Sequence, residues 1–283
     1  DITMSVTPAR EDTASGFGLL KVDDSGRVVE FSEKPTGEEL ARMRVDNRLL
    51  GLSDEEALRR PYLASMGIYV FKKEALYRLL LEELPNAVDF GKEVIPACLS
   101  RFNAQAFLFD GYWEDIGTIG SFFRANIDMT LPLPPFNFFD AESPIYTAPR
   151  YLPGSKLLDC HIQSSIITEG CIINGATVTD SVVGIRSRIA HGSRLEGVLM
   201  MGADFYQTLE ELQSDSERGY PRVGVGRNCY VRRAIIDKNA RIGNGVQIVN
   251  QSQLHEADGD NYSIRDGIVI IPKGAVVPDG TVV

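Results

Sequence analysis

Two charged residues, Glu33 and Lys34, precede Pro35 and carry the side chains needed to bind a sugar phosphate. A carboxylate accepts hydrogen bonds from sugar hydroxyls, and an ammonium binds a phosphate as a point charge. Because proline disfavours the helical region for the residue before it, we expect both residues to be extended at a strand end, with their side chains on opposite faces. Taken alone, the pair is more typical of solvated charges at a strand end.

Three further segments carry residues that could bind a sugar or a metal ion. Ser65 lies in an apolar run, where a hydroxyl usually binds nearby backbone. Asp89 precedes Phe90 and can cap a following helix. Trp113 can stack on a sugar ring, and Asp115 can bind Mg²⁺ through one oxygen while phosphates and waters complete the octahedron. A core tryptophan, with Asp115 capping the next helix, is the structural alternative.

The elements that must position these residues alternate between strands and helices up to about residue 130. Apolar runs predict strands over residues 17–22, 27–31, 62–71 and 104–109. Apolar spacing and capping signals predict helices over residues 36–43, 72–84 and 118–129. Strands that alternate with helices indicate an α/β sheet. Residues 131–153 are rich in proline, which excludes a helix or a central strand, so this segment is interpreted as a linker.

Beyond the linker, aliphatic residues recur every six positions. The two clearest series are Val183, Ile189 and Leu195, and Ile236, Ile242 and Ile248. This spacing is typical of a parallel β-helix, in which the aliphatic side chains point into a prism. A sandwich of antiparallel strands would instead alternate with a period of two. Residues 202–222 and 250–266 break the period, and we expect them to loop out of the prism.

Composition narrows the classes of ligand. The chain has 283 residues with 29 Lys+Arg and 39 Asp+Glu, a formal charge of −10 that argues against broad nucleic-acid binding. An anionic ligand therefore needs a local basic patch. No apolar run approaches the roughly 20 residues that span a bilayer, so a membrane role is not expected. The four cysteines and three histidines are scattered without the spacing of a disulfide framework or a zinc site.

In their joint order, these segments resemble the ADP-glucose pyrophosphorylases (glucose-1-phosphate adenylyltransferases), particularly the plant, algal and cyanobacterial forms. The matching stretches include FSEKPTGEEL, YLASMGIYVF, DFGKEVIPA, DGYWEDIGTI, MMGADFYQT and RAIIDKNARIG. The resemblance covers essentially the whole chain. It implies that residues 1–130 are the C-terminal part of a nucleotidyltransferase α/β (Rossmann-like) domain. It also implies that residues 154–283, after the linker at 131–153, form a left-handed parallel β-helix for regulation and oligomerisation.

The resemblance also implies roles for the residues of the first domain. Glucose 1-phosphate would contact Gly18, Glu33, Lys34 and Ser65. The same sugar pocket would be lined by Asp89, Phe90 and Trp113. Asp115 matches a magnesium-binding carboxylate. In this scheme, Lys34 holds the phosphate that attacks the α-phosphorus of ATP, and diphosphate leaves.

The family's glycine-rich phosphate loop and a second metal-binding aspartate have no counterpart in this sequence. Gly16-Phe17-Gly18 and Gly224-Val225-Gly226 are too short to replace the loop. We therefore expect the sequence to be the C-terminal part of a subunit, with most of the ATP site elsewhere. A polypeptide of these 283 residues is expected to be inactive alone, although the full-length protein would be an enzyme of starch or glycogen biosynthesis.

A basic cluster stands out in the second domain. It comprises Arg232, Arg233, Lys238 and Arg241, which could simply be exposed charges on coil corners. The resemblance implies that Lys238 and Lys273 bind the activator 3-phosphoglycerate, that phosphate inhibits, and that Arg150 lies in a matching linker motif. Ala148 departs from the polar residue that many family members carry there, so effector selectivity can differ.

Other functions remain open from the sequence. A hexapeptide acyltransferase uses the same prism with a histidine base, for which His161 and His191 are candidates by position. A regulatory subunit of the same heterotetramer, or a pyrophosphorylase for another sugar or base, would share many of these motifs. The resemblance implies a homo- or heterotetramer, in the plastid stroma of a plant or alga or in the cytoplasm of a bacterium.

Overall fold

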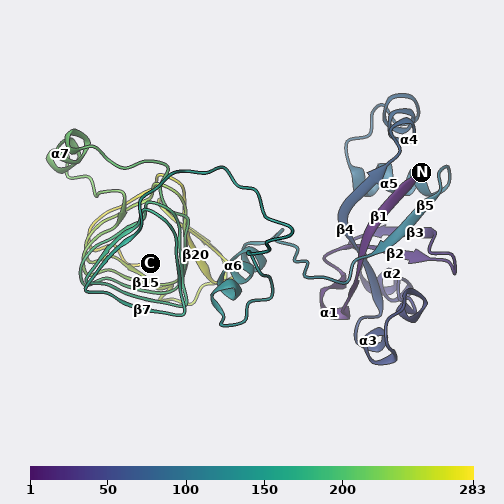
Figure 1. The fold of residues 1–283 in the computed structure, drawn as a ribbon, viewed down its shortest axis with the longest axis horizontal. Coiled ribbons are helices and arrows are strands. Elements are labelled where there is room, and N and C mark those ends of the chain that lie inside the picture. Colours follow the sequence, from purple (N-terminus) through teal and green to yellow (C-terminus); the bar gives the residue numbers. More distant parts are fainter. The chain divides into compact units, whose positions relative to one another are not determined.

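The computed structural model describes the backbone of residues 1–283 and the side chains of residues 1–48 and 51–283. The chain divides into two compact units, Asp1–Trp113 and Glu114–Val283. The first is a mixed α/β unit, and the second is built around a prism of short parallel strands (Figure 1).

The first unit is built on a five-stranded sheet in the order β3-β2-β4-β1-β5. Its strands are β1 (Ile2–Ala9), β2 (Gly18–Val22), β3 (Val28–Glu33), β4 (Tyr62–Phe71) and β5 (Ala104–Leu108). All neighbours are antiparallel except β1 and β5, which are parallel. The pairing of β1 with β4 shifts register between Met4 and Val6, which marks a bulge in the middle of the sheet.

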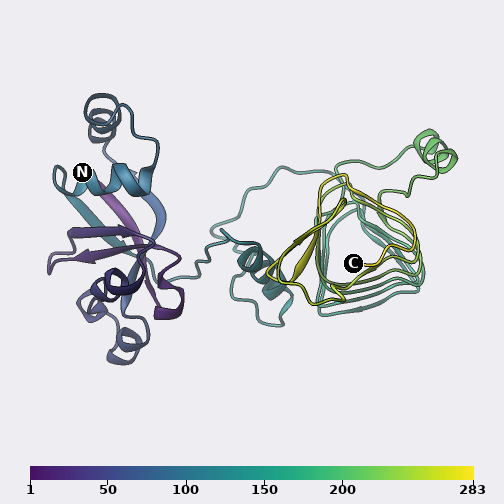
Figure 2. The same cartoon turned by 180° about the vertical axis from the view of Figure 1, so that it is seen from behind.

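Helices cover both faces of this sheet (Figure 2). They are α1 (Glu11–Ala14), α2 (Gly37–Arg42), η1 (Asn47–Leu50), α3 (Asp54–Arg59), α4 (Lys73–Tyr77), η2 (Arg78–Glu83), η3 (Phe90–Val94) and α5 (Ile95–Leu99). Leu19 and Leu20 are adjacent in β2 and point to opposite faces, yet both are fully buried. Leu19 packs in a cluster with Met43 and Tyr62, whereas Leu20 packs with Leu63 and other residues of the larger core.

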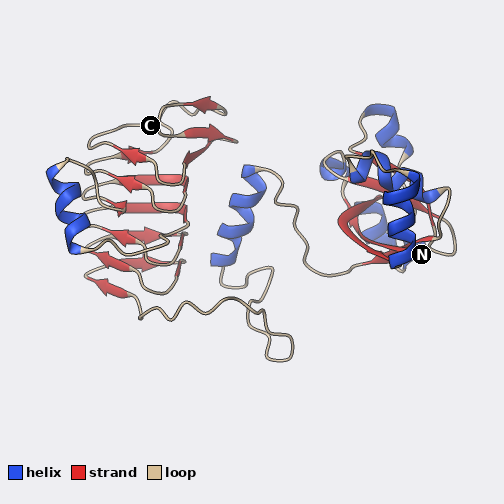
Figure 3. Ribbon diagram, turned by 90° about the horizontal axis from the view of Figure 1, so that it is seen from above, coloured by secondary structure: helices blue, strands red, loops and turns tan.

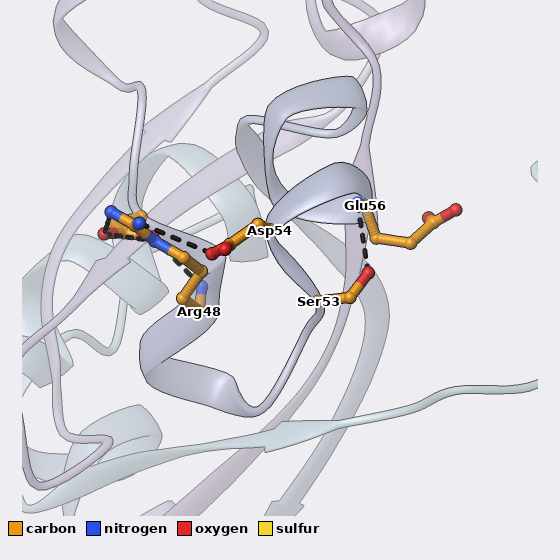
Figure 4. A network of polar contacts seen from close by, with 5 residues as sticks. Arg48, Ser53, Asp54 and Glu56 are labelled. Atoms are coloured by element: carbon orange, nitrogen blue, oxygen red, sulfur yellow. Dashed lines mark hydrogen bonds and ion pairs between the residues drawn. The ribbon is translucent and has the colours of Figure 1, made fainter.

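Short helices of this unit are fixed by local polar contacts. Ser53 caps α3 by accepting a hydrogen bond from the Glu56 N–H at 3.3 Å, and Arg48 forms ion pairs with Asp46 and, at 3.5 Å, with Asp54 (Figure 4). These contacts hold the segment between α2 and β4 without a large apolar core.

The second unit begins with α6 (Ile119–Ile127) and η4 (Asp128–Thr130). Phe123 of α6 packs in one cluster with Leu199, Ile235 and Ile268 of the prism. The expected domain boundary near residue 130 stays a prediction, but this helix packs with the β-helix because its apolar face has partners there. Residues 131–155 form no helix or strand, as the proline content of residues 131–153 predicts, and the role of this segment as a linker stays a prediction.

Parallel strands of two to seven residues wind around the prism, as Figures 1 and 3 show. The first strands are β6 (Lys156–Leu158), β7 (His161–Gln163), β8 (Ile166–Ile167), β9 (Ile172–Asn174), β10 (Thr177–Thr179), β11 (Val182–Val183), β12 (Arg188–Ile189) and β13 (Arg194–Met200). The later ones are β14 (Gly224–Val225), β15 (Tyr230–Ile236), β16 (Arg241–Ile242), β17 (Gln247–Ile248), β20 (Ile268–Ile271) and β21 (Val276–Val277). Both six-residue series are buried inside the prism, which confirms the predicted β-helix.

The two stretches that break the period leave the regular coils. The first contains α7 (Leu209–Glu217), which lies outside the prism in Figure 3, with a capping box between Thr208 and Glu211. The second carries β18 (Ala257–Asp258) and β19 (Ser263–Arg265), which pair antiparallel. Across the described residues, no helix has the length and apolar character needed to cross a membrane.

Candidate functional site

The Glu33 carboxylate lies between two glycines from different elements. Gly18, at the start of β2, pairs directly with Glu33 at the end of β3. A Cβ atom on Gly18 would lie 2.8 Å from Glu33 Oε2, and one on Gly91, in η3, would lie 3.0 Å from the same oxygen. A Cβ at Gly18 would force the Glu33 carboxylate to move, and a Cβ at Gly91 would leave it little more room. The two glycines therefore fix where this carboxylate can stand.

Ser65 and Tyr69 lie at the bulge of β4. Their hydroxyl groups hydrogen-bond at 3.1 Å, and Ser65 Oγ also accepts the Gly67 N–H at 3.2 Å. Gly67 has a positive φ of 72°, which the bulge requires. Burial raises the pKa of Tyr69, and the negative charge of Glu33 raises it further, so the phenol stays protonated near this carboxylate.

The segment around Phe90 completes this group. Asp89 accepts the Lys92 N–H at 2.8 Å and so caps η3, as predicted. The Phe90 ring stacks on Tyr69 and meets Phe71 edge-on, with centroids 6.0 Å apart in both pairs. Phe90 is 39% exposed, so part of its ring remains accessible, and the next residue, Gly91, approaches the Glu33 carboxylate.

Lys34 differs from its expected conformation. Its φ is +50°, in the left-handed region, and it is not extended as Pro35 led us to expect. Pro35 excludes the right-handed helical region, and the hydrogen bond from the Lys34 N–H to the Phe17 carbonyl at 3.0 Å holds the alternative turn. The side chain is exposed. It forms no ion pair with any residue whose side chain the structure describes.

Trp113 lies beside the same strand end. Its ring contacts Phe17, with centroids 5.5 Å apart and planes tilted by 57°. It is half-buried and not part of either apolar core of this unit, so the interpretation as a core tryptophan is wrong. Around Glu33, the carboxylate approaches Gly18 and Gly91, and its charge acts on the phenol of Tyr69.

The structure therefore brings most of the predicted residues of the first unit together. Gly18, Glu33, Ser65, Asp89 and Phe90 form one connected group, with Trp113 and Lys34 linked to it through Phe17.

Sequence reasoning missed Tyr69 and Gly91, although both lie in segments that it singled out. Tyr69 could have been found because residues two apart in a strand share a face, which places it with Ser65. Gly91 gives no such signal, because its importance comes from a carboxylate far away in sequence.

Asp115 belongs to the second unit, so its convergence with Glu33 stays a prediction. The carboxylate is exposed, and its Oδ1 accepts the Gly117 N–H at 3.0 Å. The alternative that Asp115 caps the next helix is wrong, because Thr118 caps α6 by accepting the Ser121 N–H. No cluster of three or more metal-ligating side chains occurs in the described part of the chain. A single carboxylate is still enough for Mg²⁺ when phosphates complete its shell.

The predicted effector lysines meet at one carboxylate. Lys238 Nζ and Lys273 Nζ lie 2.7 and 3.1 Å from the two oxygens of Asp204. Hydrogen bonds from Lys238, Lys273 and Asn239 hold the pKa of Asp204 far below its usual range. Arg150 donates to the Ala148 carbonyl at 3.2 Å, and within the described residues it forms no hydrogen bond or ion pair with Asp204, the carboxylate that the two lysines share.

Comparison with known proteins agrees with both architectures. The family model "Nucleotidyl transferase" matches residues 1–131, and the model "GLGC left-handed parallel beta-helix domain" matches residues 150–282. The chain thus combines a nucleotidyl transferase domain with a left-handed parallel β-helix, which confirms the expected fold class.

One relative is similar to the chain over both units. The chain is 49% identical, over 287 aligned residues, to the glucose-1-phosphate adenylyltransferase small subunit, chloroplastic/amyloplastic, of Triticum aestivum. The alignment covers 100% of this chain and 61% of the wheat protein. Over its whole length the chain is therefore similar to a glucose-1-phosphate adenylyltransferase subunit, and it spans about three fifths of the length of that relative.

Proposed function

We propose that this chain is part of an enzyme that joins ATP and glucose 1-phosphate into ADP-glucose and diphosphate. In this proposal, the unit Asp1–Trp113 binds the sugar phosphate. The observation that carries it is the Glu33 carboxylate set between Gly18 and Gly91, close enough to Tyr69 for its charge to act on the phenol on which Phe90 stacks. The family matches favour this activity over acyl transfer by the β-helix.

In this proposal, most residues of the site contact the sugar and Lys34 contacts the phosphate. Glu33 would accept hydrogen bonds from sugar hydroxyls, and Ser65 would add a hydroxyl contact. Phe90 and Trp113 would cover the apolar face of the ring. Lys34 would bind the phosphate, because its exposed ammonium has no carboxylate partner among the described side chains. Acceleration would come from position and charge, without a covalent nucleophile.

We propose Asp115 as a magnesium ligand of this enzyme. Its Oδ1 is engaged with the Gly117 N–H, so Oδ2 is the oxygen available to a cation. When bound, Mg²⁺ would neutralise negative charge on the phosphates of ATP. We keep the expected organisation as part of this proposal: a sugar-phosphate portion over residues 1–130, a linker, and a regulatory β-helix over residues 154–283.

We also propose that the β-helix binds anionic effectors at Lys238 and Lys273, with Arg150 contributing from the linker. The convergence of both lysines on Asp204 supports a shared site, since two ammonium groups already lie within reach of one carboxylate. The effectors would be 3-phosphoglycerate and phosphate. An arriving anion must compete with Asp204 for the same two charges.

The name of the wheat relative suggests the setting. It is called a small subunit and is chloroplastic/amyloplastic, so we propose a plastid location and assembly with a second type of subunit. A non-catalytic, regulatory role within such an assembly is the second candidate, because many of the same motifs would be present.

Calorimetric titration of the 283-residue chain with glucose 1-phosphate tests the proposed site independently of turnover. Glu33→Gln and Lys34→Gln are each expected to weaken binding about tenfold, because each removes a charge-assisted contact. Glu38→Gln and Lys72→Gln are matched controls, since both side chains are exposed elsewhere in the same unit. Binding that is absent, or that both site variants leave unchanged, would refute the assignment.

A further inference from the structure

A cavity of about 500 Å³ lies between the coils of the prism and the α7 segment. Its lining includes three arginines and a histidine, namely Arg188, Arg222, Arg227 and His191, and no aspartate or glutamate. This composition is the reverse of the whole chain, in which acidic residues outnumber basic ones by 39 to 29. Neither Lys238 nor Lys273 lines it, so it is separate from the proposed effector site.

The α7 segment is fastened to the sheet that forms the floor of the cavity. Arg241, on β16, pairs with Asp215 of α7 at 2.6 Å and donates to the Pro221 carbonyl at 2.8 Å. Gln207 donates to Asp215 and accepts the Val223 N–H, which ties both ends of the segment together. The cavity is therefore bounded by a segment whose position is fixed by hydrogen bonds and one ion pair.

The arginines near this cavity differ in whether a carboxylate pairs with them. The outward positions of neighbouring strands are in register: Arg188 of β12 aligns with Gly224 of β14, which pairs with Arg241 of β16. Arg241 has Asp215 as its partner. In contrast, Arg188, Arg222 and Arg227 form no side-chain hydrogen bond or ion pair with any residue in the described part of the chain.

Three guanidinium groups without carboxylates create a positive potential that an anion can satisfy. Guanidinium binds phosphate through two parallel hydrogen bonds, which is the strongest form of this contact. The remaining walls differ in character: Leu212 and Tyr220 offer apolar surface, whereas Asn174 and Ser216 offer polar groups. A volume of about 500 Å³ is in the range of small-molecule sites, which is roughly 300–1,000 Å³.

We propose that this cavity is a second anion site of the chain, which binds a small organic phosphate. Its phosphate group would contact Arg188 together with Arg222 or Arg227. Its carbon skeleton would lie against Leu212 and Tyr220, so an organic phosphate should bind more tightly than inorganic phosphate. Occupancy would join the α7 segment more firmly to the prism, because Arg222 follows α7 whereas Arg188 and Arg227 belong to the coils.

Hydrogen exchange and calorimetry on the whole 283-residue chain test this site with two probes, inorganic phosphate and glycerol 2-phosphate. Both are expected to slow amide exchange over residues 209–227, with glycerol 2-phosphate effective at the lower concentration. Arg188→Gln and Arg227→Gln should each reduce the affinity about tenfold. Their thermal unfolding should stay close to that of the wild type, since neither side chain has a partner to lose.

Two control variants separate this site from others. Lys156→Gln removes the same charge from an exposed position on β6 and should change the affinity less than twofold. Lys238→Gln should leave the protection of residues 209–227 intact, even though it weakens the proposed effector site. The proposal is overturned if neither probe protects this segment at concentrations up to about 10 mM. Equal affinity in the two arginine variants and the wild type would also overturn it.

Discussion

The two units of the chain build their cores in opposite ways. In the β-helix, each strand pairs with the strand one coil away: β13, for example, lies between β10 and β15. In the first unit, β1 pairs with β4 and with β5, so Ile2 lies opposite both Phe71 and Ala104. A repeating core can be extended coil by coil, whereas the sheet requires contacts between distant segments.

The two units also differ in how regular the backbone is around the side chains that each unit uses. The prism core is a column of buried aliphatic side chains, and its buried polar side chains, such as Ser187 and Ser193, donate to backbone carbonyls. The candidate site of the first unit lies where its sheet is irregular: at the bulge beside Ser65, at the left-handed turn of Lys34 and at the capped start of η3. In the first unit, it is this irregular backbone that positions the polar side chains of the candidate site.

The largest effect should follow from a cavity in the prism. Ile236 is fully buried in the β-helix core, so Ile236→Ala should lower the unfolding free energy of this unit by about 2–5 kcal/mol. Trp113 is the single tryptophan and belongs to the first unit, so its fluorescence reports that unit, while far-ultraviolet circular dichroism follows the strands of both. We expect the Ile236→Ala variant to shift the dichroism transition in denaturant and leave the tryptophan transition in place.

Leu63→Ala provides the reciprocal variant, because Leu63 is fully buried in the core of the first unit. It should shift the tryptophan transition by a similar amount. If either variant moves both transitions equally, the two units unfold as one, and the comparison between a repeating and a non-repeating core loses its meaning.

A smaller effect should follow from filling the space at the candidate site. A Cβ at Gly18 would lie 2.6 Å from Phe31 Cζ and 2.8 Å from Glu33 Oε2, so Gly18→Ala must displace both side chains. The expected cost is about 1–3 kcal/mol for the first unit, seen in the tryptophan transition. Gly154→Ala is the control, since nothing lies within 4 Å of its added Cβ. An unchanged Gly18→Ala transition would mean that the glycine does not fix the carboxylate.

The same contrast decides how much the sequence predicts. The six-residue period identified the prism because each of its aliphatic positions meets an identical environment one coil away. Strands β2, β3, β4 and β5 of the first unit were found from their apolar runs, and the cap at Asp89 from residue type. These features depend on local sequence alone.

Features that depend on distant contacts were not predicted from local pattern. The approach of Gly91 to Glu33 joins residues separated by several elements, and no local rule contains it. The prediction that Lys34 is extended was wrong, because the hydrogen bond from its N–H to the Phe17 carbonyl outweighs the preference imposed by Pro35. The meeting of Lys238 and Lys273 at Asp204 depends on the stacking of coils around an insertion.

The smallest effect should come from the ion pair between Arg241 of the β-helix and Asp215 of α7. The Arg241 hydrogen bond holds the pKa of Asp215 below its ordinary value of 3.8. When folding lowers the pKa of a carboxylate, the charged carboxylate stabilises the folded state. This stabilisation is complete at a pH above the pKa of the unfolded state, and it is lost as the pH falls through the pKa of the folded state. The contribution should be about 1 kcal/mol or less, because both side chains keep some exposure.

Protease cleavage within residues 202–222 measures this contribution. Cleavage of the wild type should be slow at pH 7 and should rise as the pH falls below about 4. Asp215→Asn should be cleaved faster at pH 7 and should lose most of that rise, whereas Glu217→Gln, on the same helix and exposed, should behave as the wild type. If protease cleaves Asp215→Asn at pH 7 no faster than the wild type, the ion pair does not hold α7. The insertion would then be held by packing alone, like the core of the prism.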